Sequence, residues 1–270
     1  MERELILLWV AVVAYVLSGT TAIIGVALGR RPERAVLGLL VLALLIHTLA
    51  LGFRWDRLGH GPYVTMFEIL SSNVWSLSLV FAIAYWRLPK IRAVAAVVMP
   101  ILFLMMGWMM LMDPEPSALP ATYHTVWLFI HIGFSKIFLG SVLVAVGLAI
   151  VILLREAGKG GDRLARLPDN ARLDELAYRW MALGLVFNTL MLISGAIWAQ
   201  DAWGRYWAWD PLETWAFITW LLLAIALHAR FTLKVRPRTG AVFILVVFGV
   251  AFFTFFGIPF VSDMPHKGAV

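Results

Sequence analysis

The chain of 270 residues contains no cysteine. Disulfide bonds, thiolate metal sites and thiol redox chemistry by this chain are therefore excluded. Charged residues are also scarce: they make up 14% of the sequence, whereas a soluble domain carries about a quarter. Walker, GxGxxG and HExxH motifs are missing, so the sequence does not carry the common signatures of soluble nucleotide-binding proteins and zinc proteases.

What the sequence does contain is long hydrophobic runs. It is 62% hydrophobic with a mean hydropathy of +0.87. About 20 apolar residues cross a bilayer core of roughly 30 Å as a helix, and unpaired backbone groups are costly in lipid. We therefore predict an all-α integral membrane protein with about eight transmembrane helices, forming a single polytopic domain over residues 1–270. The expected spans are 5–29, 35–53, 66–86, 93–111, 126–153, 179–198, 213–231 and 240–260.

The basic residues predict the orientation of these spans. Sixteen of the 22 Lys and Arg residues fall in segments on one side of the eight spans, and five fall on the other. Because positive charge accumulates on the cytoplasmic side, we expect both termini and the loop 199–212 to be extracytoplasmic. The net charge of +6 is then a sign of topology, with no nucleic acid as a partner. The chain begins Met-Glu-Arg-Glu and lacks an A-x-A-like cleavage site, so we interpret 5–29 as a retained span.

Tryptophans are concentrated in one expected outer loop and the helix after it. Residues 202–220, "AWGRYWAWDPLETWAFITW", contain five, and with Trp198 the cluster holds six of the thirteen in the chain. One interpretation is an ordinary aromatic belt at the membrane interface. The other is a platform for a large, flat, apolar ligand such as a porphyrin, because aromatic faces stack on such ligands and indole N–H groups reach polar edges.

Histidines could supply iron ligands beside such a platform, because one imidazole from each side is a common way to hold haem iron. His131 starts the fifth span, and Trp127 lies four residues before it on the same helical face. His228 lies near the inner end of the seventh span, about 22 Å along the helix from Glu213. A simple position in the headgroup region is the alternative for His228.

Other ionisable residues have plainer interpretations. We expect His47 to hydrogen-bond to a neighbouring helix, and His60 and His124 to be solvated in loops. Lys136 lies about one turn inside the fifth span, where a lone charge is costly. We expect it to pair with Glu68 or Glu213, and contact with a propionate or substrate is the alternative.

The chain resembles the CcsA/ResC type of cytochrome c assembly proteins, which carry the tryptophan-rich "WWD" signature of haem-handling proteins. The resemblance rests on the pattern WGxYWxWDPxETW followed by LHxR within residues 173–230. It extends to "GHGPYVTMFEILSSNVW" at 59–75, "WLFIHIGFSK" at 127–136 and "FFGIPFVSDMPH" at 255–266, and so covers most of the chain.

The resemblance implies a function in System II cytochrome c biogenesis. Such proteins act with a ResB/CcsB-type membrane partner, carry haem b as a transported substrate from the cytoplasmic side, and attach it to the CxxCH segment of apocytochrome c as a cytochrome c synthase. By position, His131 and His266 match the outer histidines that bind the haem iron, and His228 matches an inner one. The WWD residues correspond to Trp203, Trp207, Trp209 and Asp210.

Two other functions stay open at this point. One is a haem-transfer subunit without ligation activity, like the System I proteins with the same signature. The other is a respiratory membrane anchor that binds haem or quinone. The expected location is the inner (cytoplasmic) membrane, or a thylakoid-type membrane if the source is a phototroph.

Overall fold

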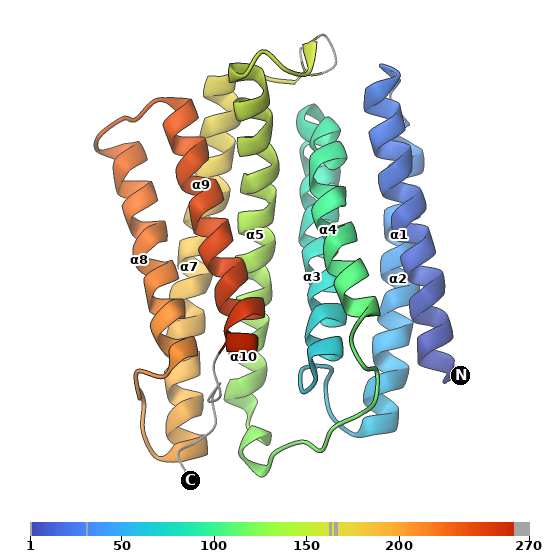
Figure 1. Ribbon diagram of the computed structural model, residues 1–270, viewed down its shortest axis with the longest axis vertical. Helices are drawn as coiled ribbons and strands as arrows, with labels where there is room; N and C mark the ends of the chain where they lie inside the picture. Colours follow the sequence, from blue (N-terminus) through green and yellow to red (C-terminus); the bar gives the residue numbers. More distant parts are fainter. Residues whose placement is uncertain (1, 31, 162–163, 165–166, 262–270) are drawn as a thin grey trace. The chain divides into compact units, whose positions relative to one another are not determined.

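The chain folds into helices. The computed structural model describes residues 2–30, 32–161, 164 and 167–261, and these residues contain no strand. Within them, eight helices are long and apolar enough to cross a membrane. The prediction of an all-α, multi-pass membrane protein is therefore confirmed (Figure 1).

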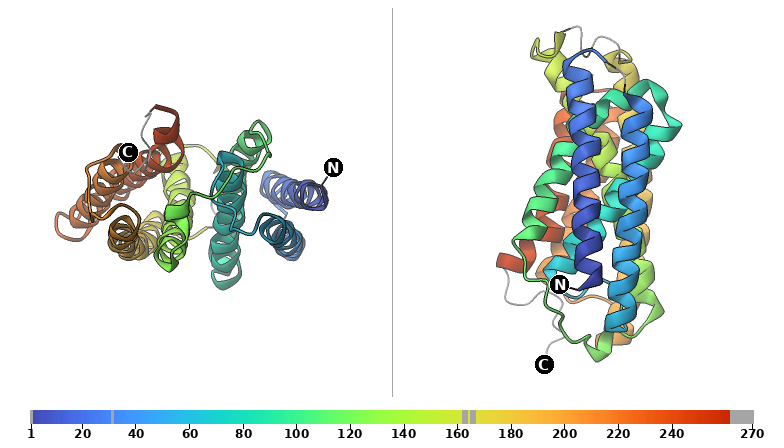
Figure 2. Two further views of the ribbon diagram at one scale, coloured as in Figure 1. Left: turned by 90° about the horizontal axis from the view of Figure 1, so that it is seen from below. Right: turned by 90° about the vertical axis from the view of Figure 1, so that its right-hand side faces the viewer.

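Two compact units make up the chain, and each is described by itself. The first comprises Met1–Leu119 and Ala157–Pro168. In this unit α1 packs against α2 and α4, and α3 packs against α2 and α4, so the helices close a ring (Figure 2). Its helices are α1 (Arg3–Ala27), α2 (Glu33–Leu58), α3 (Met66–Arg87), the 3-10 turn η1 (Pro89–Val94) and α4 (Ala95–Met110).

Pro120–Glu156 and Asp169–Val270 form the second unit. Here α5 packs along α7 and against α9, while α8 packs against both α7 and α9. The start of α5, the α7–α8 loop and the end of α10 lie at one end of this unit (Figure 1). Its elements are η2 (Ala121–Tyr123), α5 (Val126–Glu156), α7 (Asn170–Trp203), α8 (Pro211–Phe231), α9 (Pro237–Phe252), the π-helical turn η3 (Phe253–Gly257) and α10 (Ile258–Val261).

The sixth span is longer than the sequence predicts. We expected a span over 179–198, but α7 runs unbroken from Asn170 to Trp203. Its start is fixed by Asp169, whose side chain accepts a hydrogen bond from the backbone N–H of Arg172. Charged residues in the first turns are tolerated because Asp174, fully buried, pairs with Arg230 of α8. Ion pairing thus extends the helix where hydropathy alone would end it.

A buried ion pair is also present in the first unit, at the start of α3. Arg54 of α2 donates from Nε to Oε1 of Glu68 at 2.9 Å, and both side chains are almost wholly buried. The second carboxylate oxygen of Glu68 accepts from the backbone of Val64, and Thr65 caps the same helix in a capping box. Arg54 also donates to the carbonyl of Pro114, which holds the loop after α4 against this site.

Candidate functional site

The tryptophan-rich loop is shaped by the start of α8. Asp210 is the N-cap of this helix, and its Oδ1 accepts from the backbone N–H of Glu213 at 2.8 Å. Glu213 reaches back with Oε2 to the N–H of Ala208 at 2.7 Å and that of Asp210 at 3.4 Å, completing a capping box. Pro211 fits the first helical turn, where no N–H is needed. The Asp-Pro-x-Glu part of the motif therefore builds the helix start that closes the loop.

His131 is held by the backbone of α7. Its Nδ1 lies 2.8 Å from the carbonyl oxygen of Met191. A carbonyl can only accept, so Nδ1 must carry the proton, and this tautomer puts the ring's lone pair on Nε2. A histidine that binds a metal almost always donates its other N–H in this way, which fixes the orientation of the ring. The local geometry of His131 is thus that of a preorganised metal ligand.

Gly195 makes room for the His131 ring. It lies four residues after Met191 and therefore on the same face of α7. A Cβ atom at this position would lie 2.7 Å from Nδ1 and 2.8 Å from Cε1 of His131. The close approach of α5 to α7 at this point requires glycine, which our sequence analysis did not single out.

Aromatic rings continue the site on both sides of His131. Trp198 lies 6.0 Å from the imidazole and 5.0 Å from Trp203, measured between ring centroids. Trp207 and Trp209 meet edge to face at 5.6 Å, and Trp209 remains 67% exposed. Burial raises the pKa of the Tyr123 phenol, which packs edge-on against Trp198. The side chains thus offer several flat apolar surfaces next to one preorganised imidazole.

A small cavity of about 60 Å³ lies among these residues. His131, Trp203 and Trp207 line it, together with Thr254 and Phe255 of the π-helical turn η3. The indole N–H of Trp207 is buried and has no hydrogen-bond partner. A ligand with an anionic or carbonyl edge would satisfy this donor, so the residues present fit a porphyrin with propionate groups. The cavity is too small to enclose a porphyrin. The exposed side chains of Trp209 and Tyr206 would cover the porphyrin at the surface.

The structure gathers some of the expected site residues and leaves others apart. His131, Trp203 and Trp207 line the cavity, and Trp209 contacts Trp207. Asp210 caps α8, as described above. His228 is exposed near the end of α8, with Nδ1 3.3 Å from the Thr232 hydroxyl, and so lies a helix length away from the loop. His266 lies outside the described residues.

The other histidines in the described residues differ in their burial and hydrogen bonds. His47 bonds through Nε2 to Ser71 of α3 at 3.0 Å and lies 3.4 Å from the Tyr15 hydroxyl, which confirms the expected bond to a neighbouring helix. His124 is exposed, as expected. His60 is buried, which corrects the expectation of a solvated loop residue: the left-handed Gly59 turns the chain, and His60 Nδ1 lies 2.9 Å from the carbonyl of Gly61.

Lys136 was expected to pair with Glu68 or Glu213. Glu68 is engaged by Arg54, and Glu213 by the backbone of Ala208 and Asp210. Both carboxylates therefore have other partners that account for their burial, and the pairing of Lys136 stays a prediction.

The chain is similar to known cytochrome c biogenesis proteins. The CcsA cytochrome c biogenesis protein of Chlamydomonas reinhardtii is 32% identical over 238 residues, which cover 85% of this chain and 65% of that protein. The CcsA protein of Prochlorococcus marinus strain MIT 9515 is 32% identical over 254 residues, covering 84% of this chain and 81% of that protein.

A solved structure shares the fold. The structure titled cytochrome c heme lyase CcmF matches with a TM-score of 0.71 and 19% identity, covering 95% of this chain and 47% of that one. The sequence profile of the cytochrome C assembly protein family matches residues 63–266, which include both α5 with His131 and the tryptophan-rich loop. The chain therefore belongs to the cytochrome c assembly protein family.

Proposed function

We propose that this membrane protein presents haem at the His131 site and supports its covalent attachment to apocytochrome c. Membership of the assembly family places the chain in cytochrome c biogenesis. The observation that carries the finer proposal is the bond from His131 Nδ1 to the Met191 carbonyl, because it would orient the imidazole as an iron ligand near the indole N–H of Trp207, which has no hydrogen-bond partner among the described residues.

Each part of the site has a task in this proposal. His131 binds the iron on one side through Nε2, and His266 is the second ligand. Trp203, Trp207 and Trp209 contact the porphyrin, whose propionate accepts the indole N–H of Trp207. Asp210 acts by fixing the loop through the cap of α8. The exposed position of Trp209 leaves one edge of the porphyrin open to a second reactant.

The proposed reaction is thioether formation with the CxxCH segment of apocytochrome c. Each cysteine thiol of the substrate adds across one haem vinyl group: a carbon–sulfur bond forms, and the thiol proton ends on the other vinyl carbon. The addition consumes no oxidant or reductant. The chain has no cysteine that could compete as a nucleophile. The contribution of the protein is then mainly the positioning of two reactants.

A ResB/CcsB-type membrane protein is the proposed partner, with haem b as substrate entering from the cytoplasmic side. In this scheme both termini and the tryptophan-rich loop face outward, and His228 holds haem on its way to the outer site. The cytochrome c heme lyase CcmF shares the fold of this chain.

An absorption spectrum of the chain, purified alone and with such a partner, tests the proposal. We expect a bis-histidine haem spectrum and, with the partner present, covalent cytochrome c in a host that lacks its own assembly system. A His228→Ala variant should also lose haem from the outer site, because its supply stops. Bound haem without any dependence of cytochrome c formation on this chain would instead support a respiratory anchor.

A further inference from the structure

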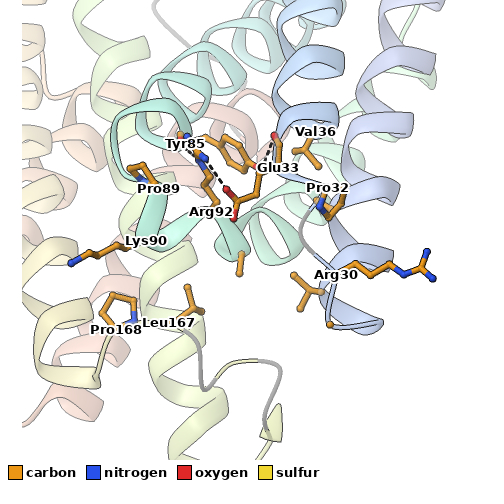
Figure 3. A pocket seen from close by; sticks show the side chains of 14 residues that line it. Arg30, Pro32, Glu33, Val36, Tyr85, Pro89, Lys90, Arg92, Leu167 and Pro168 are labelled. Carbon is orange, nitrogen blue, oxygen red and sulfur yellow. Dashed lines mark hydrogen bonds and ion pairs between the residues drawn. The ribbon is translucent and has the colours of Figure 1, made fainter.

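A cavity is also present in the first unit. It has a volume of about 600 Å³ and is formed where α1 leads into α2 and where α3 leads through η1 into α4 (Figure 3). Leu167 and Pro168, which also belong to this unit, complete its wall. The haem site proposed above uses none of these residues.

Local backbone structure creates the basic side of this cavity. Helix α1 ends in a Schellman motif: the N–H of Gly29 bonds to the Val26 carbonyl, and that of Arg30 bonds to the Gly25 carbonyl. Gly29 has a φ of 66°, a conformation that glycine adopts without strain. A Cβ atom on Gly25 would lie 2.6 Å from the Pro32 ring, so the turn is packed tightly against the helix. This geometry fixes Arg30 at the rim of the cavity.

The second basic segment comes from η1. Arg92 donates from Nε to the Tyr85 carbonyl at 3.0 Å and from Nη1 to Glu33 at 2.7 Å, and its guanidinium lies over the Tyr85 ring. These three side chains lie together on one side of the cavity (Figure 3). Lys90, one residue after the proline that starts η1, lies at the rim.

Charge in the cavity wall is unbalanced. Arg92 is neutralised by Glu33, which is the single acidic residue among the described residues of the lining. Arg30 and Lys90 are exposed and lie on opposite sides of the opening, with their charged ends directed away from each other (Figure 3). Part of the wall is apolar, with Ala22 and Val36 among its residues.

We propose that this cavity binds an anionic phospholipid, with the phosphate at the opening, where the long side chains of Arg30 and Lys90 turn toward it, and the first part of an acyl chain against the apolar wall. Two cations without an ion pair among the described residues, together with an apolar wall, match the two parts of such a lipid. The cavity lies at the ends of membrane-spanning helices, where headgroups are found, and basic pockets between helices at this depth bind acidic headgroups. Long Lys and Arg side chains reach headgroups from helix ends while their stems cover apolar surface.

Thermal unfolding of the full chain in neutral detergent tests this site. We expect phosphatidylglycerol to raise the unfolding temperature more than phosphatidylcholine does. In the double variant Arg30→Gln, Lys90→Gln this difference should disappear, with the affinity for phosphatidylglycerol lowered roughly 30-fold, because each basic residue contributes about a fivefold factor. The matched control is Arg34→Gln, Arg87→Gln, which removes the same charge from nearby residues that do not line the cavity and should keep the difference.

A second variant tests the space in the cavity separately from the charge of its basic residues. Ala93 lines the cavity, so Ala93→Phe fills the space and leaves both basic residues in place. We expect this variant to lose the preference for phosphatidylglycerol while its unfolding temperature in phosphatidylcholine stays close to that of the unmodified chain. Native mass spectrometry of the unmodified chain should show one retained phosphatidylglycerol that both altered proteins lack.

Three results would overturn the proposal. Inorganic phosphate that stabilises the chain as well as phosphatidylglycerol would assign the site to a free anion. Displacement of the retained lipid by haem would assign it to a porphyrin. An equal loss of the lipid effect in the control variant would show that net charge, and not this cavity, is responsible.

Discussion

Two histidines, one in each unit, show how the same side chain takes different roles. His47 lies between helices of the first unit, is 1% exposed, and its two ring nitrogens face the side chains of Tyr15 and Ser71. His131 in the second unit has Nδ1 on a backbone carbonyl and its ring at a cavity lined by tryptophan. A ring bonded at both nitrogens by neighbouring side chains holds helices together. A ring oriented from the backbone, beside a cavity, can instead serve a ligand.

The comparison extends to the charged groups around each histidine. The first unit keeps its buried charge in a pair, Arg54 with Glu68, which contributes to packing. The second unit uses Asp210 and Glu213 to form a helix cap that positions a loop. Glu68 and Glu213 both complete capping boxes, but Glu68 also pairs with a buried arginine, whereas Glu213 fixes the loop that carries the tryptophans.

The largest effect is expected from breaking the pair in the first unit. Glu68→Gln removes the nearer of the two carboxylates beside buried Arg54 and leaves Glu4, whose Oε1 lies 3.9 Å from Nη1, so the free energy of unfolding should fall by about 3 kcal/mol. Denaturation in detergent measures it. Glu175→Gln, which breaks exposed pairs with Arg172 and Arg179, is the control and should change stability by less than about 1 kcal/mol. Equal stability of both variants would contradict a structural role for Glu68.

Replacing the two histidines tests the comparison directly. His131→Ala should weaken haem binding by roughly 100-fold or more, because an oriented ligand is lost, while the chain stays folded. Added imidazole should restore part of the signal by filling the empty position. His47→Ala should lower the unfolding temperature and leave haem affinity unchanged. A haem titration followed by absorbance measures both, and normal binding by His131→Ala would transfer the role to another residue, with His124 the next candidate.

Gly195→Ala tests whether the orientation of the His131 ring contributes to haem affinity. The added methyl group would lie 2.7 Å from the imidazole, so the ring must move away from the Met191 carbonyl. We expect haem affinity to fall about tenfold, as for loss of an orienting partner. Gly184→Ala on the same helix is the matched control, since its Cβ would meet Val142 at 3.3 Å and touch no site residue. An altered haem spectrum in Gly195→Ala alone would support the assignment, and identical behaviour of both variants would refute it.

The smallest effect concerns the buried indole N–H of Trp207. In Trp207→Phe this unpaired donor disappears, so the free energy of unfolding without haem should rise by about 1 kcal/mol. Haem affinity should fall about fivefold, because the bond to a propionate is lost. The two changes have opposite signs, and that distinguishes a ligand contact from ordinary packing. A loss of both stability and affinity would indicate that Trp207 only packs.

The sequence predicts much of this fold because hydropathy and helix length are local properties. All eight spans are present, and errors fall at ends such as the start of α7, where the pairing of Asp174 with Arg230 cannot be read from a window of residues. His131 and the tryptophans could be predicted from their residue types and motif. The bond to Met191 and the space at Gly195 could not, since both depend on how α5 meets α7.

Asp210 shows that a local structural role can also be predicted from the sequence. Its place in the WWD motif predicts a contact with haem, and its Oδ1 also accepts the N–H of Glu213 at the start of α8. An N-cap followed three residues later by Glu is readable from sequence, and the Asp-Pro-x-Glu spacing carried that signal.

The π-helical turn at Phe253–Gly257 divides the last span into two registers. Its hydrogen bonds skip one residue more than those of an α-helix, so the chain after the turn is rotated by roughly one residue's step, about 100°. The side facing α8 at the start of the turn, where Thr254 bonds to the Thr219 hydroxyl and the Trp215 carbonyl, is thereby uncoupled from the side presented by Ile258–Val261. A single added residue lets packing within the bundle and the direction of the final turn be adjusted independently.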